Sequence, residues 1–187
     1  MSLSPIKFEI LEAMLLLDKP EKPAVIAKYA GKDFPSAMMH ILWLTRMGYA
    51  SAPAKGLYAI TEKGKKALGL PDISREKAQE IIAPLPLDKA FHFYADIGKP
   101  LNLSAHSLQD FCEKILNVDE VSINFHLNRG DFESWFTCIG DDELARKVTL
   151  LKAKKNIGED LRKRLHTIVK NRCMALASIA AHAVTSL

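Results

Sequence analysis

Four polar side chains within a short stretch could do chemistry: His126, Arg129, Asp131 and Glu133. An imidazole can act as a general acid or base when a carboxylate orients it, so His126 with Asp131 could in principle support catalysis. The sequence contains no Gly-rich phosphate loop, nucleophile elbow, paired cysteine ligands or H-E-x-x-H motif. We therefore expect no catalytic residue, no metal site and no cofactor, and we expect that the protein is not an enzyme.

A structural role explains the same residues from local geometry. Gly130 can end one helix in the left-handed conformation while Asp131 caps the next, and Gly140 with Asp141 repeats this arrangement. Arg129 can pair with Asp131 or with Asp141. We predict a structural role for the five residues of this region, with an enzyme as a remote alternative: His126, Arg129, Asp131, Trp135 and Asp141.

The elements that position these residues come from a chain of 187 residues, 48% hydrophobic and 26% charged. This length suits two small domains, and the frequent Ala, Leu, Lys and Glu favour helix over strand. We predict a mainly α protein. Residues 1–70 form a winged helix-turn-helix with a small β-hairpin wing, residues 71–88 a linker with a short helix, and residues 89–187 an all-helical or nearly all-helical domain.

The N-terminal region divides at its prolines and glycines. The first helix begins at Pro5, after Ser4, and continues to about Leu17; a second begins at Pro23 and ends before Gly31. A third helix begins at Pro35 and continues through Met47. Two short strands at 49–52 and 57–60 then form a hairpin, and a further helix begins after Thr61.

The end of this region carries a recognisable series, namely Leu44, Gly48, Tyr58, Ile60, Thr61, Gly64 and Leu68. It resembles the L-x-x-x-G … Y-x-L-T-x-x-G-x-x-x-L ending of winged-helix transcriptional regulators such as the MarR-like and PadR-like families. The resemblance covers about 70 residues. It implies a DNA-binding regulator whose third helix enters the major groove and whose wing reaches phosphate or the minor groove.

Transferred to this chain, the resemblance implies contacts with double-stranded DNA. The candidate DNA-binding residues are Lys22, Lys28, Lys32, Ser36, His40, Arg46, Lys55 and Lys63. The register of the third helix directs Ala37, Ile41 and Leu44 inward.

Four outward residues of the third helix depart from the DNA-reading pattern. They are apolar and cannot bind phosphates: Met38, Met39, Leu42 and Trp43. Such a patch is typical of a protein contact, either with the C-terminal domain or with a partner chain. A protein-interaction adaptor that binds no DNA is therefore the alternative function.

The second half begins after a Pro-rich link at 83–87. Residues 90–94 are the densest aromatic cluster, and they fit a strand or the start of a helix. Ser104 or Ser107 caps a following helix and Asp119 caps another, which ends at Gly130. Helices continue from Asp141 and, after a break at 156–158, to the C-terminal region.

The stretch from Ser107 to Ala145 resembles a largely archaeal domain family with the signature S-L-x-x-F … F-H-x-x-R-x-D-F-x-x-W … G-D-x-x-L-A. The matching residues are Ser107, Leu108, Phe111, Phe125, His126, Arg129, Asp131, Phe132, Trp135, Gly140, Asp141, Leu144 and Ala145. The resemblance spans roughly residues 90–176. It implies a domain family without an established chemistry.

The last helix has an apolar face that includes Leu161, Leu165, Ile168 and Ala183, with basic residues including Arg162 and Arg172 around it. We expect these basic residues to be solvated, with nucleic-acid contact as the alternative. The Ala-rich tail at 173–187 suits a homodimer interface or an intramolecular helix pair, so the second domain is expected to dimerise or to sense a partner.

Charge is distributed unevenly along the chain. Residues 89–143 carry 10 acidic and 4 basic side chains, whereas residues 144–187 carry 2 and 10. Attraction within the chain or between subunits explains this pattern as readily as nucleic acid does.

No segment resembles a secretory signal or a membrane span, which predicts a cytoplasmic protein without a membrane partner. The three cysteines are widely separated and lie in apolar contexts. We expect Cys112, Cys138 and Cys173 to be reduced core residues.

Overall fold

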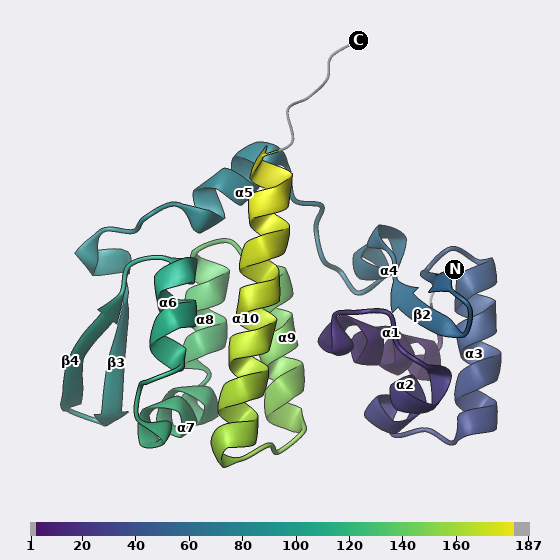
Figure 1. Ribbon diagram of the computed structural model, residues 1–187, viewed down its shortest axis with the longest axis horizontal. Helices are drawn as coiled ribbons and strands as arrows, with labels where there is room; N and C mark the ends of the chain where they lie inside the picture. The colour runs from purple at the N-terminus through teal and green to yellow at the C-terminus, as the bar shows by residue number, and fades with distance from the viewer. Residues whose placement is uncertain (1–2, 182–187) are drawn as a thin grey trace, which may run out of the picture. The chain divides into compact units, whose positions relative to one another are not determined.

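The computed structural model describes residues 3–181 and shows a mainly helical chain with two small antiparallel hairpins (Figure 1). The chain divides into two compact units, Met1–Asp72 and Ile73–Leu187. The mainly α fold class with a small β-hairpin is therefore confirmed. No helix among the described residues is long and apolar enough to cross a membrane.

The first unit contains three helices, a hairpin and a short fourth helix. The elements are α1 (Pro5–Leu17), α2 (Pro23–Ala30), α3 (Phe34–Arg46), β1 (Ala50–Ala54), β2 (Leu57–Ile60) and α4 (Glu62–Ala67). Proline begins α1 and α2, Gly31 ends α2 with φ 66°, and the Asp33 carboxylate caps α3 by accepting from the Ser36 N–H at 2.9 Å.

The core of the first unit forms where α1, α2 and α3 pack together. Ala37, Ile41 and Leu44 of α3 are fully buried, as the helical register predicts. They meet the apolar side of α1 and α2, which buries Ile10, Leu11, Met14, Leu15 and Ile26. Burial of these aliphatic side chains is the main stabilisation of the unit.

The hairpin is tied to the helices by a contact that the sequence pattern does not show. Strands β1 and β2 pair antiparallel, with Ala50 opposite Ile60 and Ser51 opposite Ala59. On the other edge of β2, Glu21 and Tyr58 exchange two backbone hydrogen bonds of 2.9 Å each. The segment between α1 and α2 therefore adds a one-residue third strand to the hairpin.

Seven helices and strands precede the long last helix in the described part of the second unit. They are α5 (Arg75–Ile82), β3 (Phe91–Asp96), β4 (Lys99–Ala105), α6 (Leu108–Ile115), α7 (Glu120–Arg129), α8 (Asp131–Cys138) and α9 (Asp142–Ala153). A 3-10 turn at Leu87–Lys89 precedes β3, and the long helix α10 (Gly158–Ala181) packs against α5, α6, α7 and α9. Residues 90–94, for which strand and helix were both open, lie almost entirely in strand β3.

Strand β3 supplies the centre of the second core. Its alternation buries Phe91 and Phe93 and exposes His92, because successive side chains point to opposite faces of a hairpin. The Phe91 ring lies 5.4 Å from Phe111 and 5.5 Å from Trp135, measured between ring centroids. Helix α7 packs on β3 and α6 packs on β4, so the hairpin is covered on one face.

Two basic residues of α10 that we expected on a solvated face are integrated into the unit. Arg172 is buried, and its Nε donates to both oxygens of Asp141 at 3.0 and 2.8 Å. Arg162 donates to the carbonyl oxygens of Ile115 and Val118, where α6 ends. The expectation of solvation is wrong for Arg172, because the Asp141 carboxylate, which directly precedes α9, pairs with its charge.

The three cysteines are free thiols, but only Cys112 and Cys173 are buried. Cys138, the last residue of α8, is exposed, so its assignment to the core is wrong. The apolar context of Cys138 comes from the buried residues Trp135 and Phe136, which lie on another face of the same helix. Ala183, assigned to the apolar face of the last helix, lies outside the described residues.

Candidate functional site

The surface that a DNA-binding first unit would use is the outer face of α3 with the adjacent hairpin. Arg46 is the exposed cation of this helix, whereas Ser36 and His40 are half-buried. The remaining exposed face is apolar: Phe34 is 52% exposed, Met39 60%, Leu42 49% and the following Met47 41%. The predicted apolar patch is therefore present at Met39 and Leu42, while Met38 is half-buried.

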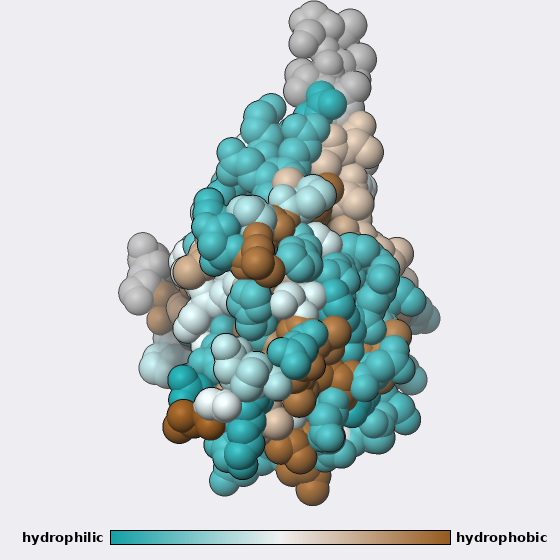
Figure 2. All heavy atoms as spheres, turned by 90° about the vertical axis from the view of Figure 1, so that its left-hand side faces the viewer, coloured by the Kyte–Doolittle hydropathy of each residue, from teal (hydrophilic) through white to brown (hydrophobic). Residues whose placement is uncertain are grey.

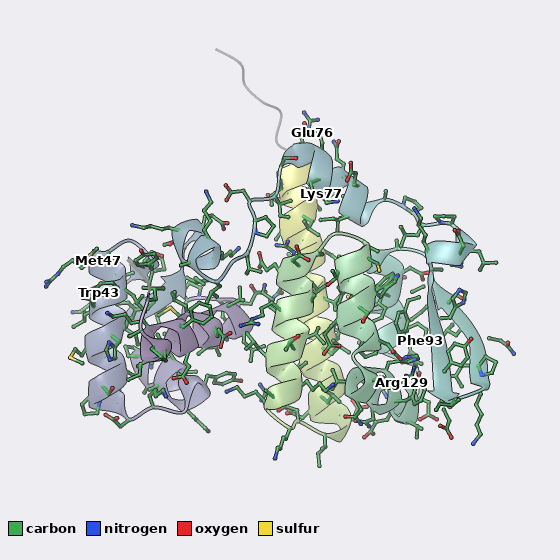
Figure 3. All side chains as sticks on the ribbon, turned by 180° about the vertical axis from the view of Figure 1, so that it is seen from behind. Trp43, Met47, Glu76, Lys77, Phe93 and Arg129 are labelled. Carbon is green, nitrogen blue, oxygen red and sulfur yellow. The ribbon has the colours of Figure 1, made fainter. Side chains whose placement is uncertain are left out.

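Trp43 has its contacts within the first unit. Its ring lies parallel to that of Tyr49, with an angle of 12° between planes and 6.2 Å between centroids. The Lys7 ammonium of α1 lies 3.6 Å from the Trp43 ring centroid, and Lys63 of α4 lies 4.6 Å from the Tyr49 centroid. Trp43 lies in the last turn of α3, and Met47 directly follows the helix at the same end (Figure 3). This half-buried stack removes Trp43 from the freely exposed patch.

The candidate DNA-binding cations fall into two groups. Lys32 is half-buried and pairs with Glu9 of α1, so its charge is compensated. The others are exposed and form no ion pair with a described residue: Lys22, Lys28, Arg46, Lys55 and Lys63. They belong to α2, α3, the hairpin turn and α4. Lys63 is additionally oriented, because its ammonium donates to the Met47 carbonyl oxygen at 2.8 Å.

In the second unit, His126 of α7 connects three elements. Its ring is 3% exposed and packs edge-on against Phe91, with 4.8 Å between centroids. Nε2 accepts the backbone N–H of Tyr94 in β3 at 2.8 Å, and Nδ1 lies 2.8 Å from the Asp131 carboxylate of α8. The first bond requires an unprotonated Nε2, so Nδ1 carries the proton and donates to Asp131.

This geometry fixes the charge state of the imidazole. Burial lowers the pKa of His126 below its ordinary value, while the Asp131 carboxylate opposes the shift. With Nε2 already accepting from a backbone N–H, neither ring nitrogen is available to a reacting group while β3 stays in place. The neutral ring therefore joins β3, α7 and α8 through its two hydrogen bonds.

Asp131 does not have the capping role that the sequence suggested. Gly130, with φ 78°, precedes α8, and no side chain caps this helix end. The Asp131 side chain instead turns toward α7, where its Oδ2 also accepts from Arg129 Nε at 3.1 Å. The proposal that Asp131 is an N-cap is wrong, because the buried imidazole and the guanidinium are stronger partners than an exposed backbone N–H.

Asp141 and Trp135 have structural positions. The Asp141 carboxylate caps α9 by accepting from the Leu144 N–H at 3.1 Å and pairs with Arg172, while Trp135 Nε1 donates to the Lys89 carbonyl oxygen at 2.9 Å. Glu143 extends the Asp141 cluster by accepting from Arg172 and by pairing with Lys147. Of the two partners predicted for Arg129, the structure therefore shows Asp131, whereas Asp141 pairs with Arg172.

An open cleft of about 350 Å³ lies beside the His126 contacts. Strand β3 and its turn supply one wall, and α7 with the first residue of α8 supplies the other, so Tyr94, Ile97, Phe125, Arg129 and Asp131 line a common space. Arg129 of α7 lies close to β3 (Figure 3). On the side of the unit that carries the hairpin, hydrophobic patches lie between hydrophilic ones (Figure 2).

Sequence reasoning found one wall of this cleft but missed the other. The signature contributes Phe125, His126, Arg129 and Asp131, whereas Tyr94 and the turn residue Ile97 were not considered as site residues. The aromatic cluster at 90–94 was the available signal, but its strand assignment was open. Among residues 3–181, no group of three or more His, Cys, Asp or Glu side chains is arranged to hold a metal ion.

Comparison with protein-family models, curated proteins and solved structures finds no match for this chain.

Proposed function

We propose that the first unit is a winged-helix domain that binds double-stranded DNA, and that the protein is a transcriptional regulator. The order of three helices, a hairpin and the Glu21–Tyr58 bridge supports this proposal, because the bridge joins the hairpin to the segment before α2. In such a domain α3 is the helix presented to the major groove and the hairpin is the wing.

The observation that carries the proposal is the set of five exposed, unpaired cations in the first unit. The other exposed lysines of this unit pair with carboxylates, Lys19 with Glu21 and Lys66 with Asp72. The uncompensated charge is left on α2, the end of α3, the hairpin turn and α4. Neutralising phosphates releases counterions from DNA, so unpaired cations contribute directly to affinity.

A salt titration of duplex binding tests this proposal. We expect affinity to fall steeply with salt, with a logarithmic slope of about 0.9 for each phosphate contact. Lys28→Ala and Lys55→Ala should each reduce the slope by about one. Lys66→Ala is the matched control, because the Lys66 charge already pairs with Asp72 at 2.6 Å. Absence of duplex binding at low salt would refute the proposal.

The exposed apolar residues of α3 favour a second candidate, a protein-interaction adaptor. Met39 and Leu42 cannot bind phosphate, and Phe34 and Met47 extend the apolar surface at the two ends of the helix. Leu42→Glu separates the two functions. On a DNA-binding helix the new carboxylate repels the duplex and weakens binding, whereas an adaptor shows no duplex binding before or after the change.

We assign dimerisation or sensing to the second unit, and a cytoplasmic location because a regulator needs access to the chromosome. Met174 on the exposed side of α10 is 63% exposed and supports self-association of this helix. Light scattering at micromolar concentration should give the mass of a homodimer. A monomeric mass would count against dimerisation without bearing on the duplex experiment.

A further inference from the structure

The cleft beside His126 combines apolar walls with polar atoms that have no partner among the described residues. Phe91 and Phe125 form part of its wall, and the turn between β3 and β4 forms its rim. Ile97 in this turn is 77% exposed although it is a large aliphatic residue. Concave sites with mostly apolar walls and a few convergent polar groups are typical of small-molecule binding.

Three polar groups line this space and have unused hydrogen-bonding capacity. Both bonds to Asp131 arrive at Oδ2, from His126 and Arg129, so Oδ1 receives no hydrogen bond from the described residues. Arg129 uses Nε for Asp131, and its two terminal nitrogens donate to none of residues 3–181. The Tyr94 hydroxyl likewise has no partner there, because the bond of Tyr94 to His126 uses the backbone N–H.

Arg129 and Asp131 are held in position although both are partly exposed. The Arg129 guanidinium carbon lies 5.1 Å from the Phe125 ring centroid, and its Nε is bound to Asp131. Asp131 is fixed in turn by the buried His126 ring. A guanidinium whose Nε is engaged and whose plane lies over an aromatic ring presents its terminal nitrogens as a fork that matches a carboxylate.

The charges of the cleft discriminate between ligand classes. Arg129 and Asp131 contribute one charge of each sign, and the other carboxylate of the lining, Asp96, pairs with Lys99 at 3.3 Å. A ligand with only an anionic group would be repelled by the Asp131 carboxylate. A ligand with only a cationic group would be repelled by the Arg129 guanidinium. A small molecule with adjacent charges of both signs satisfies both side chains at once.

We propose that this cleft binds a free α-amino acid with an apolar side chain. The ligand carboxylate binds the terminal nitrogens of Arg129, and the ligand ammonium binds Asp131 Oδ1. The apolar side chain of the ligand lies against Phe125 and Ile97, which buries part of the exposed Ile97 surface. This site is independent of the proposed DNA-binding surface, so failure of one proposal leaves the other intact.

Titration of the full chain with L-phenylalanine and L-leucine tests the proposal. For L-phenylalanine, 3-phenylpropanoate lacks the ammonium group and 2-phenylethylamine lacks the carboxylate. Calorimetry measures binding directly. Trp135, whose ring lies 5.5 Å from that of Phe91, provides a fluorescence reporter in a Trp43→Phe background. We expect each analogue to bind at least about tenfold more weakly than the amino acid, because each loses a charge-assisted hydrogen bond.

Arg129→Gln identifies the group that binds the carboxylate. This substitution should weaken binding of L-phenylalanine by about tenfold and should not weaken binding of 2-phenylethylamine, because that analogue has no carboxylate to lose and no longer faces the guanidinium charge. Lys163→Gln, which removes an exposed charge of α10 outside the cleft, is the control. Unchanged thermal unfolding of both variants excludes a folding effect.

Three results would overturn the amino-acid site. The first is no binding of either amino acid at millimolar concentration by the folded protein. The second is equal affinity for L-phenylalanine and its two analogues, which would mean that the cleft binds the apolar group and recognises neither charge. The third is full retention of L-phenylalanine affinity by Arg129→Gln.

Discussion

Replacing His126 with alanine removes from the core of the second unit a ring that both packs against aromatic side chains and makes hydrogen bonds. The ring is 3% exposed and lies within 6 Å of Phe91, Phe125 and Phe132, measured between centroids. Its two nitrogens bond to Tyr94 and Asp131 at 2.8 Å each. The substitution therefore leaves a cavity in the aromatic core and a strand N–H without its acceptor.

The expected cost can be divided between these two effects. The cavity contributes about 2 kcal/mol, at the lower end of large-to-small core substitutions because an imidazole is smaller than a benzyl group. The lost bonds contribute about 2 kcal/mol more, because the backbone N–H of Tyr94 is left without a partner. His126→Ala should thus reduce the free energy of unfolding by about 4 kcal/mol. His126→Phe leaves no cavity but still leaves the Tyr94 N–H without its acceptor, and it should cost only about 2 kcal/mol.

Urea unfolding measured by Trp135 fluorescence in a Trp43→Phe background measures this free energy for the second unit. A change of one kcal/mol corresponds to about 4 °C in Tm for a unit of this size, so the alanine variant should lose about 16 °C. His92→Ala is the matched control, because this exposed histidine lies on the opposite face of β3 and its hydrogen bonds to Leu87 and Ser104 are solvent-exposed, so its loss should cost no more than about 1 kcal/mol. An alanine variant within about 1 kcal/mol of the parent protein would refute the structural role of His126.

Three further predictions concern the two cores and the thiols. Burial lowers the pKa of His126 below its ordinary value of 6.5, so below this pH His126 is protonated in the unfolded chain before it is protonated in the folded unit. The free energy of unfolding therefore falls as pH falls below about 6.5. His126→Phe should lack this part of the decline when urea unfolding is compared at several pH values. Gly64→Ala places a Cβ atom 2.3 Å from the Tyr49 carbonyl oxygen and should lower the unfolding free energy of the first unit by about 2 kcal/mol, measured by thermal unfolding. Burial raises the pKa of Cys173 to about 12, so a thiol reagent should modify Cys138 rapidly and Cys173 only after denaturation.

The helices and their ends were predictable because their signals are local. Pro5 and Pro23 begin helices, Gly31 ends one in the left-handed conformation, and Thr61 and Ser107 cap others. Each of these effects acts over one helical turn, and the apolar period then identifies the buried face. The register of α3 follows from this period and is confirmed by the burial of its inward residues.

Contacts between distant segments were not predictable on the same basis. The bridge between Glu21 and Tyr58 consists of backbone hydrogen bonds, which leave no trace in residue type. In the sequence Arg172 does not differ from the other basic residues beside the apolar face of α10. Only the packing of α10 near Asp141 buries Arg172 and pairs it with that carboxylate. The cleft depends on strand β3, so it could not be foreseen while the conformation of residues 90–94 was open.

The signature residues show why a sequence motif by itself could not separate a structural role from a binding role. His126 uses both of its ring nitrogens within the unit, whereas Asp131 uses one carboxylate oxygen and Arg129 one of its three guanidinium nitrogens. The same hydrogen bonds that stabilise the connection between β3, α7 and α8 therefore orient the remaining atoms toward the cleft. Loss of His126 should then impair ligand binding through misplacement of Asp131, while Arg129→Gln should impair binding without loss of stability. The two substitutions thus distinguish the residue that supports the site from the residue that contacts the ligand.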